Sequence, residues 1–121
     1  MRLFAIASLA VLATACGGRA GGTCNSEGFL CQDASSALEC KVGVWVALPC
    51  RGPTGCQRQG DLVRCDMAAN VAGDACASTV EGKGLCMSDG LGTLGCRDGT
   101  LVKTNVCRTC TVSADMVVCQ P

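Results

Sequence analysis

The sequence predicts a small, mainly β protein that is rich in disulfides and is built from short hairpins in two tandem six-cysteine modules. The cysteine content, the lack of aromatic residues and an internal repeat all support this fold class. The chain has 121 residues, of which 13 are cysteine, two are Phe and one is Trp. Such cysteine density in a short chain is typical of a disulfide scaffold in an oxidising compartment. With so few large apolar side chains, a hydrophobic core alone could not hold the chain folded.

Twelve of the cysteines fall into two sets of six whose surroundings match. In both sets the third cysteine lies in the pattern Leu-x-Cys-x-x-Gly, the fourth is followed by arginine, and the sixth is preceded at two positions by valine. Matches of this kind at corresponding cysteines indicate a duplication. The first set is Cys24, Cys31, Cys40, Cys50, Cys56 and Cys65, and the second is Cys76, Cys86, Cys96, Cys107, Cys110 and Cys119.

Short hairpins are expected inside each module. Residues 41–43 and 97–99 end in glycine and predict hairpin turns, because glycine accepts the positive φ that such turns need. In the first module β segments over 37–40 and 44–48 flank the turn, and further hairpins are expected over 57–65 and 111–119. Three disulfides in each module would use all twelve cysteines. Fifteen pairings are open within each module, and the sequence does not choose among them.

The N-terminal segment predicts export. Residues 1–15 combine Arg2, an apolar stretch and the small residues Ala13-Thr14-Ala15, and the apolar stretch is too short to span a bilayer but suits a signal peptide. The expected organisation is a lipoprotein signal peptide over 1–15, a lipidated cysteine with a Gly-rich flexible tether over 16–23, modules over 24–66 and 76–121, and a linker over 67–75.

Cys16 is the thirteenth cysteine, and an odd thiol in an exported protein needs an explanation. The run from Leu12 to Cys16 resembles a bacterial lipobox, in which Cys16 becomes the lipidated N-terminus; Ala13 departs from the leucine usual there. This resemblance implies a membrane partner through lipid on Cys16. Gly17 is not the aspartate that retains some lipoproteins at the inner membrane, which implies the outer membrane or cell surface of a bacterium. The alternative is plain secretion with Cys16 unlipidated.

Several function classes are disfavoured by composition. The ten basic and ten acidic residues balance, so no nucleic-acid partner is expected. The chain has no histidine, which removes Ser–His and Cys–His catalysis and weakens a zinc site. The pair Cys107 and Cys110 could be a redox dithiol, but its position in the repeat favours structural cysteines. We therefore expect no enzyme, no cofactor and no metal.

The pattern around Cys40, Gly43 and Trp45 resembles two known families. One is a cysteine-rich repeat of predicted lipoproteins in myxobacteria and similar bacteria, which has no assigned function. The other is the small chitin-binding module of fungal chitinases, which the first module resembles more fully than the second. The matching residues are Cys40, Gly43, Trp45, Val46, Cys50, Gly55, Cys56, Val63 and Cys65.

These observations predict a non-catalytic cell-envelope lipoprotein that serves as a binding or structural surface module. The first alternative is a glycan-binding site centred on Trp45, with Phe29 as a weaker second aromatic. Its polar neighbours would be Glu39, Lys41 and Arg51; a tryptophan that caps the core is the simpler interpretation.

The second alternative is a protein-binding or protease-inhibitor-like loop over Arg51–Gly55, led by Arg51 and clamped by cysteines on both sides. An ordinary exposed turn is the simpler interpretation of this loop.

Overall fold

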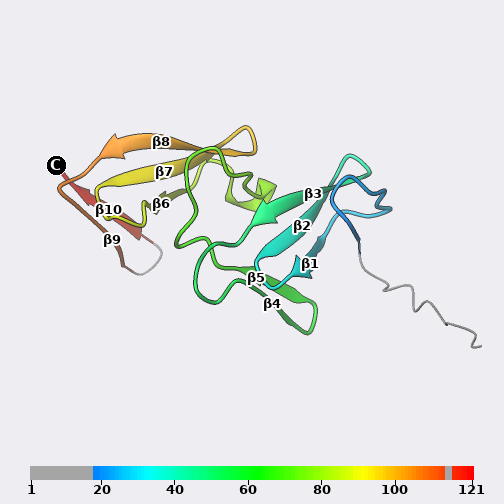
Figure 1. Cartoon of the computed structure of the whole chain (residues 1–121). Helices are drawn as coiled ribbons and strands as arrows, with labels where there is room; N and C mark the ends of the chain where they lie inside the picture. The colour runs from blue at the N-terminus through cyan, green and yellow to red at the C-terminus, as the bar shows by residue number, and fades with distance from the viewer. Residues whose placement is uncertain (1–17, 114–115) are drawn as a thin grey trace, which may run out of the picture.

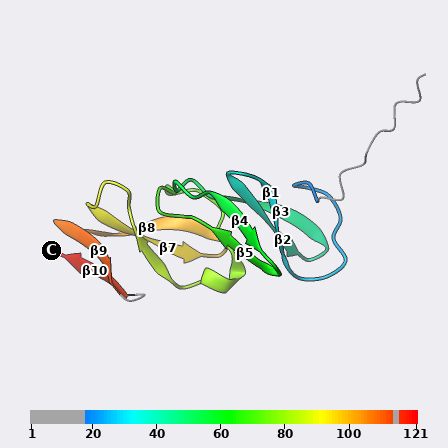
Figure 2. The same cartoon turned by 90° about the horizontal axis from the view of Figure 1, so that it is seen from below.

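The computed structural model describes residues 18–113 and 116–121, and its strands form two similar halves that lie end to end (Figure 1). We call residues 18–66 module 1 and the described residues from 70 onward module 2. The N-terminal segment of the described chain, drawn in blue, lies near one end of the elongated molecule and the C-terminus near the other, in both views (Figures 1 and 2). The predicted fold class, small, mainly β and disulfide-rich, is confirmed. The predicted leader, 1–15, and Cys16 lie outside the described residues.

Module 1 combines a three-stranded antiparallel sheet with a separate hairpin. The sheet has the order β1-β2-β3 and the hairpin pairs β4 with β5. The strands are β1 (Phe29–Asp33), β2 (Ser36–Lys41), β3 (Val44–Pro49), β4 (Cys56–Gln59) and β5 (Leu62–Cys65). The sequence predicted β2, β3 and the second hairpin.

Module 2 repeats this plan after a short 3-10 turn, η1 (Ser78–Val80). Its sheet has the order β6-β7-β8 and its hairpin pairs β9 with β10. The strands are β6 (Gly84–Cys86), β7 (Gly92–Arg97), β8 (Thr100–Val106), β9 (Thr109–Ser113) and β10 (Met116–Gln120). In the described residues, no helix is long and apolar enough to cross a membrane.

The disulfides have the same connectivity in both modules. The first cysteine pairs with the third, the second with the fifth and the fourth with the sixth. The pairs are Cys24–Cys40, Cys31–Cys56 and Cys50–Cys65 in module 1, and Cys76–Cys96, Cys86–Cys110 and Cys107–Cys119 in module 2. Cys107 and Cys110 therefore pair with separate partners and form no dithiol couple with each other.

The hairpin turns predicted from glycine are present. The turn between β2 and β3 has Val42 at φ 50° and Gly43 at 77°, and the turn between β7 and β8 has Asp98 at 52° and Gly99 at 75°. Positive φ at both central residues is the type I′ geometry that matches the twist of a hairpin. The turn between β4 and β5 contains Gly60 at φ 61°.

Each module opens with a segment that is hydrogen-bonded to its third strand. The Gly21 amide donates to the Trp45 carbonyl at 2.8 Å and the Trp45 amide to the Gly22 carbonyl at 2.9 Å. In module 2 the Gly73 amide donates to the Leu101 carbonyl, and the Leu101 amide to the Asp74 carbonyl, both at 2.8 Å. We call residues 18–23 and 70–75 the opening segments.

The opening segments lie within the regions expected as a tether, 16–23, and as a linker, 67–75. An isolated β-bridge joins each segment to the third strand of its module, Thr23 to Val44 and Ala75 to Thr100. The physical reason is that the outer edges of β3 and β8 carry unpaired backbone groups, which the preceding segment satisfies. Glycine-rich composition alone does not reveal such pairing.

The buried core is small in each module. Ala37, Leu48 and Cys50 form one cluster, against which Phe29 and Val63 pack. The other cluster is formed by Cys76, Leu94, Cys96 and Leu101. Because each cluster has so few apolar side chains, the disulfides supply much of the stability by restricting the unfolded chain.

Candidate functional site

Trp45 lies on β3 and is half-buried under the N-terminal opening segment. A Cβ atom added at Gly18 would lie 2.5 Å from Trp45 Nε1 and 2.8 Å from Cδ1, so the backbone of Gly18 rests against the indole. Trp45 is also directly opposite Cys40, which is bonded to Cys24. This packing favours the core-capping interpretation of Trp45 over a sugar platform.

The polar residues expected beside Trp45 lie on the other face of the sheet. Trp45 pairs with Cys40, whereas Glu39 and Lys41 flank Cys40 on β2, and successive side chains of a strand point to opposite faces. The structure therefore does not bring Glu39 and Lys41 together with Trp45 in one site.

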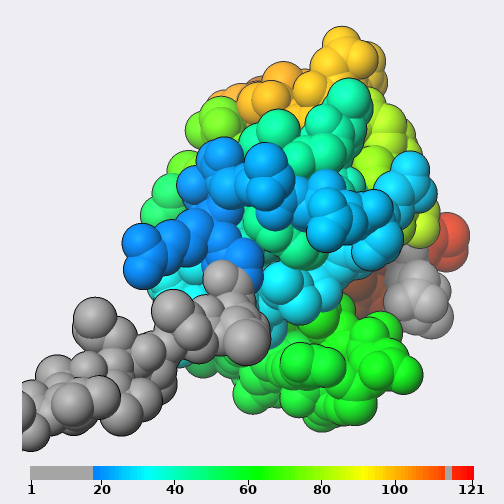
Figure 3. Space-filling view, turned by 90° about the vertical axis from the view of Figure 1, so that its right-hand side faces the viewer, coloured from blue at the N-terminus to red at the C-terminus, as the bar shows by residue number. Residues whose placement is uncertain are grey.

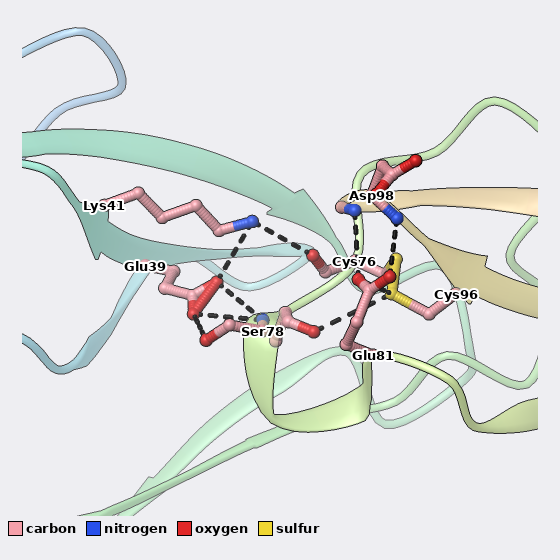
Figure 4. A network of polar contacts seen from close by, with 9 residues as sticks. Glu39, Lys41, Cys76, Ser78, Glu81, Cys96 and Asp98 are labelled. Carbon is pink, nitrogen blue, oxygen red and sulfur yellow. Dashed lines mark hydrogen bonds and ion pairs between the residues drawn. A yellow bond between two sulfur atoms is a disulfide. The ribbon is translucent and has the colours of Figure 1, made fainter.

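Glu39 and Lys41 instead join the two modules (Figure 4). Glu39 is only 4% exposed, and its carboxylate accepts hydrogen bonds from the Ser78 amide at 3.0 and 3.1 Å and from Ser78 Oγ at 2.5 Å. Lys41 Nζ lies 3.4 Å from Glu39 Oε1 and donates to the Cys76 carbonyl at 3.3 Å. The buried carboxylate is thus fully satisfied by module 2 and by its own lysine.

Arg51 is held by the opening segment of module 2. Its Nε and Nη2 donate to Asp74 Oδ2 and Oδ1 at 2.8 and 3.0 Å, and its amide donates to Asn70 Oδ1 at 3.0 Å. The hydrogen bonds from Arg51 lower the pKa of Asp74, and the same contact raises the pKa of Arg51. To bind a ligand, the Arg51 guanidinium would have to give up its bidentate hydrogen bonds to Asp74. Its position therefore indicates a structural role.

The loop 51–55 is fastened to Asp66. Thr54 donates to Asp66 Oδ2 from its amide at 3.1 Å and from Oγ1 at 2.8 Å, and the Gly52 amide donates to the Asp66 carbonyl at 2.9 Å. The hydrogen bond from the Thr54 amide is the main cause of the lowered pKa of Asp66. Because the loop is hydrogen-bonded to Asp66 of its own module, its role is structural. This favours the interpretation as an ordinary turn over an inhibitor-like loop.

Another acidic residue, Glu81, accepts hydrogen bonds from the backbone of its own module beside a disulfide. It accepts hydrogen bonds from the Asp98 amide at 2.5 Å and the Gly99 amide at 3.1 Å. The potential ligand atoms of Glu81, Cys76 and Cys96 lie within 4.8 Å of one another. The two sulfur atoms are bonded to each other, however, so this cluster offers no thiolate to a metal.

The sequence did not predict the hollows of the surface. An apolar cavity of about 190 Å³ lies at the junction, between Phe29, Leu48 and Val63 of module 1 and Thr79 and Val80 of module 2. Phe29 therefore lines the hollow between the two modules and packs against the core of module 1.

Another hollow, of about 450 Å³, lies on the sheet of module 2 and adjoins a groove beside the β9–β10 hairpin. The sequence signal for this hollow is the pair of glycines, Gly84 and Gly95, at positions where module 1 carries Phe29 and Glu39.

Comparisons with known proteins supply no further guide to this site: no family model, curated protein or solved structure matches the chain significantly.

Proposed function

We propose that the chain is an exported, non-catalytic lipoprotein, anchored through Cys16 to the bacterial outer membrane or cell surface, whose two modules form a rigid binding module. The observation that carries the proposal is the disulfide pattern. Twelve cysteines pair among themselves with one connectivity repeated twice, and this leaves Cys16 over. An unpaired thiol directly after a leader of this kind is explained if lipid blocks it.

The arrangement of the modules supports display away from a membrane. Residues 18–28, drawn in blue, lie at the end of the molecule that faces the viewer in Figure 3, whereas the β9–β10 hairpin lies at the opposite end in Figure 1. With an anchor at Cys16, module 2 would be the distal part. The Glu39–Ser78 and Arg51–Asp74 contacts would hold it at a fixed orientation.

Four carboxylates of the described residues are engaged within the fold, which supports binding over catalysis. Glu39, Asp66, Asp74 and Glu81 each accept hydrogen bonds from within the fold. A general acid or base has to be within reach of a substrate proton and close to the matching group. The chain has no histidine to take this role.

Intact mass of the native protein, before and after reduction and alkylation, tests the anchor and the disulfides together. We expect a gain of twelve alkyl groups and a Cys16 that carries acyl chains, with loss of the lipid and of membrane association in a Cys16→Ser variant. A gain of thirteen alkyl groups without lipid would mean ordinary secretion and would overturn the anchor. Free thiols and bound metal in the native sample would overturn the disulfide scaffold.

Glycan binding at Trp45 is the alternative within the binding class. Trp45 is the only tryptophan of the chain, so its fluorescence reports directly on this site. Because Gly18 covers the indole, we expect chitin oligosaccharides and cell-wall fragments to leave the emission unchanged. A saturable shift would favour the glycan-binding alternative instead.

A further inference from the structure

Two directly opposed side chains of module 1 are replaced by glycine in module 2. Phe29 on β1 is the cross-strand partner of Glu39 on β2, and Gly84 on β6 is the cross-strand partner of Gly95 on β7. The positions correspond, because Phe29 and Gly84 each lie two residues before the second cysteine of their set, and Glu39 and Gly95 directly precede the third. A ring and a carboxylate are thus missing from one face of module 2.

In module 1 the two side chains on this face are engaged. The Phe29 ring packs against the cluster of Ala37, Leu48 and Cys50, and the Glu39 carboxylate accepts hydrogen bonds from Ser78. A hollow of about 380 Å³ remains beside them, lined by Phe29, Glu39 and Lys41 together with Ser78 and Thr79. A segment of the following module is therefore seated on the face of module 1.

The corresponding face of module 2 is open. Its hollow is lined by Gly84, Gly95, Arg97 and Thr104, among others, and no segment of the described chain lies across it. The adjoining groove is walled by Val112, Met116 and Val117 of the β9–β10 hairpin. Val117 lies two residues before the last cysteine, as Val63 does. The groove beside Gly84 is therefore the space that corresponds to the Phe29 ring.

The backbone does not require glycine at either position. Neither Gly84 nor Gly95 has a positive φ. A Cβ at Gly84 would lie 3.4 Å from its nearest neighbour, the Leu94 carbonyl oxygen, and a Cβ at Gly95 would lie 3.0 Å from Thr104 Cγ2, a methyl group that can move. A side chain fits the backbone at Gly84, so glycine there leaves open space. Gly95 is buried beneath the Thr104 methyl group and the Arg97 side chain, so glycine there lets these two side chains lie close to the sheet.

The charge of the face also differs between the modules. Lys41 has Glu39 as its partner at 3.4 Å, whereas the corresponding Arg97 meets Gly95, which has no carboxylate. Lys83 lines the same hollow. The one acidic residue there, Glu81, accepts hydrogen bonds from the Asp98 and Gly99 amides. The hollow thus has a basic end at Arg97 and Lys83, and the apolar wall belongs to the groove that adjoins it.

We propose that this face of module 2 binds an extended segment of another protein that supplies an aromatic side chain to the groove beside Gly84 and a carboxylate to Arg97. The proposal rests on the binding role proposed above and names its site and partner. The two groups are those that module 1 carries itself. The bound chain would take the place that Ser78 and Thr79 have on module 1.

A second copy of this chain fits the face less well. The segment after its first cysteine, Cys24, would bring Ser26 to the place of Ser78, because both serines lie two residues after the first cysteine of a module. Ser26 would present an amide and a hydroxyl as donors, and Gly95 has no side-chain acceptor for them.

A sugar also fits this face less well, because the wall of valine and methionine lacks the aromatic surface on which sugars stack.

The probe is the acetylated and amidated peptide Thr-Phe-Thr-Glu-Thr, in which the aromatic and acidic side chains share one face of an extended strand. It is titrated into the purified, oxidised, isotope-labelled chain, and amide chemical shifts are followed. We expect saturable shifts at Gly84, Gly95 and Arg97 and none at Trp45. Peptides with Ala for Phe, or Gln for Glu, are the matched ligands and should bind more weakly.

Two variants test the two contact points. Gly84→Phe places a ring of the chain itself in the groove and should lower the affinity for the parent peptide by about tenfold or more. Arg97→Gln should weaken the Glu peptide by about two- to fivefold and leave the Gln peptide unaffected. Val118→Phe, on the outer face of the same hairpin, should leave binding of both peptides unchanged.

The site is overturned by three outcomes: no shifts at Gly84 and Gly95, equal binding of all three peptides, or concentration-dependent dimers that occupy this face. If Gly84→Phe fails to fold, Arg97→Gln with the paired peptides still decides the question. None of these outcomes affects the mass measurement of lipid on Cys16. Absence of lipid, conversely, would leave a peptide-binding result standing.

Discussion

The turn residues Val42 and Asp98 hold corresponding positions but differ in how well they tolerate a positive φ. Both have positive φ, at 50° and 52°. Aspartate tolerates the left-handed region, whereas a β-branched residue there is strained. Val42 is 102% exposed, so no burial of its side chain offsets this strain. The turn between β2 and β3 is therefore a site of stored conformational energy.

Val42→Asn should stabilise the protein by about 1 kcal/mol, because it creates the Asn-Gly pair that type I′ turns favour. Thermal unfolding followed by circular dichroism measures the effect. The matched variant is Asp98→Val in module 2, which should lower the midpoint. A Val42→Asn protein that melts no higher than the original would contradict the strain argument.

A comparison of Gly55 with Gly60 distinguishes two reasons for a glycine, a positive φ and the lack of room for a side chain. Their φ values are 59° and 61°, but a Cβ at Gly55 would lie 1.9 Å from the Ala34 carbonyl oxygen, whereas Gly60 has open space around it. The close approach exists because the Cys56 amide donates to this same carbonyl at 2.9 Å.

Gly60→Ala should cost about 1 kcal/mol from φ alone. Gly55→Ala should cost about 3 kcal/mol or more, or prevent correct oxidation, because backbone must also move. Denaturant unfolding of the two oxidised variants, with thiol titration, makes the comparison. Equal losses would show that the contact with Ala34 does not constrain the loop.

At the scale of the element, the opening segment of module 2 does more than begin a sheet. Asn70 is 1% exposed and donates from Nδ2 to the Pro49 carbonyl at 2.8 Å. Asp74 binds Arg51 and accepts from the Val71 amide at 3.0 Å. One short segment thus connects the loop after β3 with the edge of β8.

The lowered pKa values of Asp74, in this segment, and of Asp66 predict that acid destabilises the fold. Hydrogen bonds from Arg51, above all, hold the pKa of Asp74 below its usual value, and the Thr54 amide does the same for the pKa of Asp66. A carboxyl group with a lowered pKa in the folded state stabilises the fold above its unfolded pKa of about 3.9, and this contribution is lost as pH falls through the folded value.

We therefore expect the melting temperature to fall below about pH 4. Asp74→Asn should lower the melting temperature at neutral pH and reduce its fall in acid. Calorimetry across this pH range measures both effects. Asp61→Asn, at an exposed turn, is the control for loss of one charge. If both variants flattened the profile equally, the contact with Arg51 would not be its cause.

At the scale of the whole molecule, a buried carboxylate fixes the orientation of the two modules. Glu39 comes from the middle strand of module 1 and binds Ser78 at the start of η1 in module 2. Its burial requires these donors, since an unsatisfied buried carboxylate is costly. The contact specifies how the modules meet as well as how tightly.

Glu39→Gln and Ser78→Ala should each destabilise the oxidised protein, by about 1–3 kcal/mol for a buried group that loses its partner. The double variant should lose less than the sum, because both changes remove one interaction. A double-mutant cycle in denaturant provides the coupling energy. Additive losses would mean that the junction does not depend on this contact, and Glu27→Gln, at an exposed position, is the control.

The sequence by itself determined what depends on composition and local pattern. Thirteen cysteines predicted the disulfide scaffold, the Leu-x-Cys-x-x-Gly repeat predicted two similar modules, and glycines at 43 and 99 predicted the turns that occur. These features are local because turn geometry depends on the φ angles of two residues. β1 and β6 escaped prediction, since their short runs have no clear alternation.

Only the tertiary structure decided what depends on partners distant in sequence. Asp74 lies 23 residues from Arg51, and Ser78 lies 39 residues from Glu39. The environment of such side chains is set when the modules meet, so their roles cannot be read from neighbouring residues. The same holds for the disulfide connectivity and for the hollow of module 2, which exists because Gly84 and Gly95 become cross-strand partners.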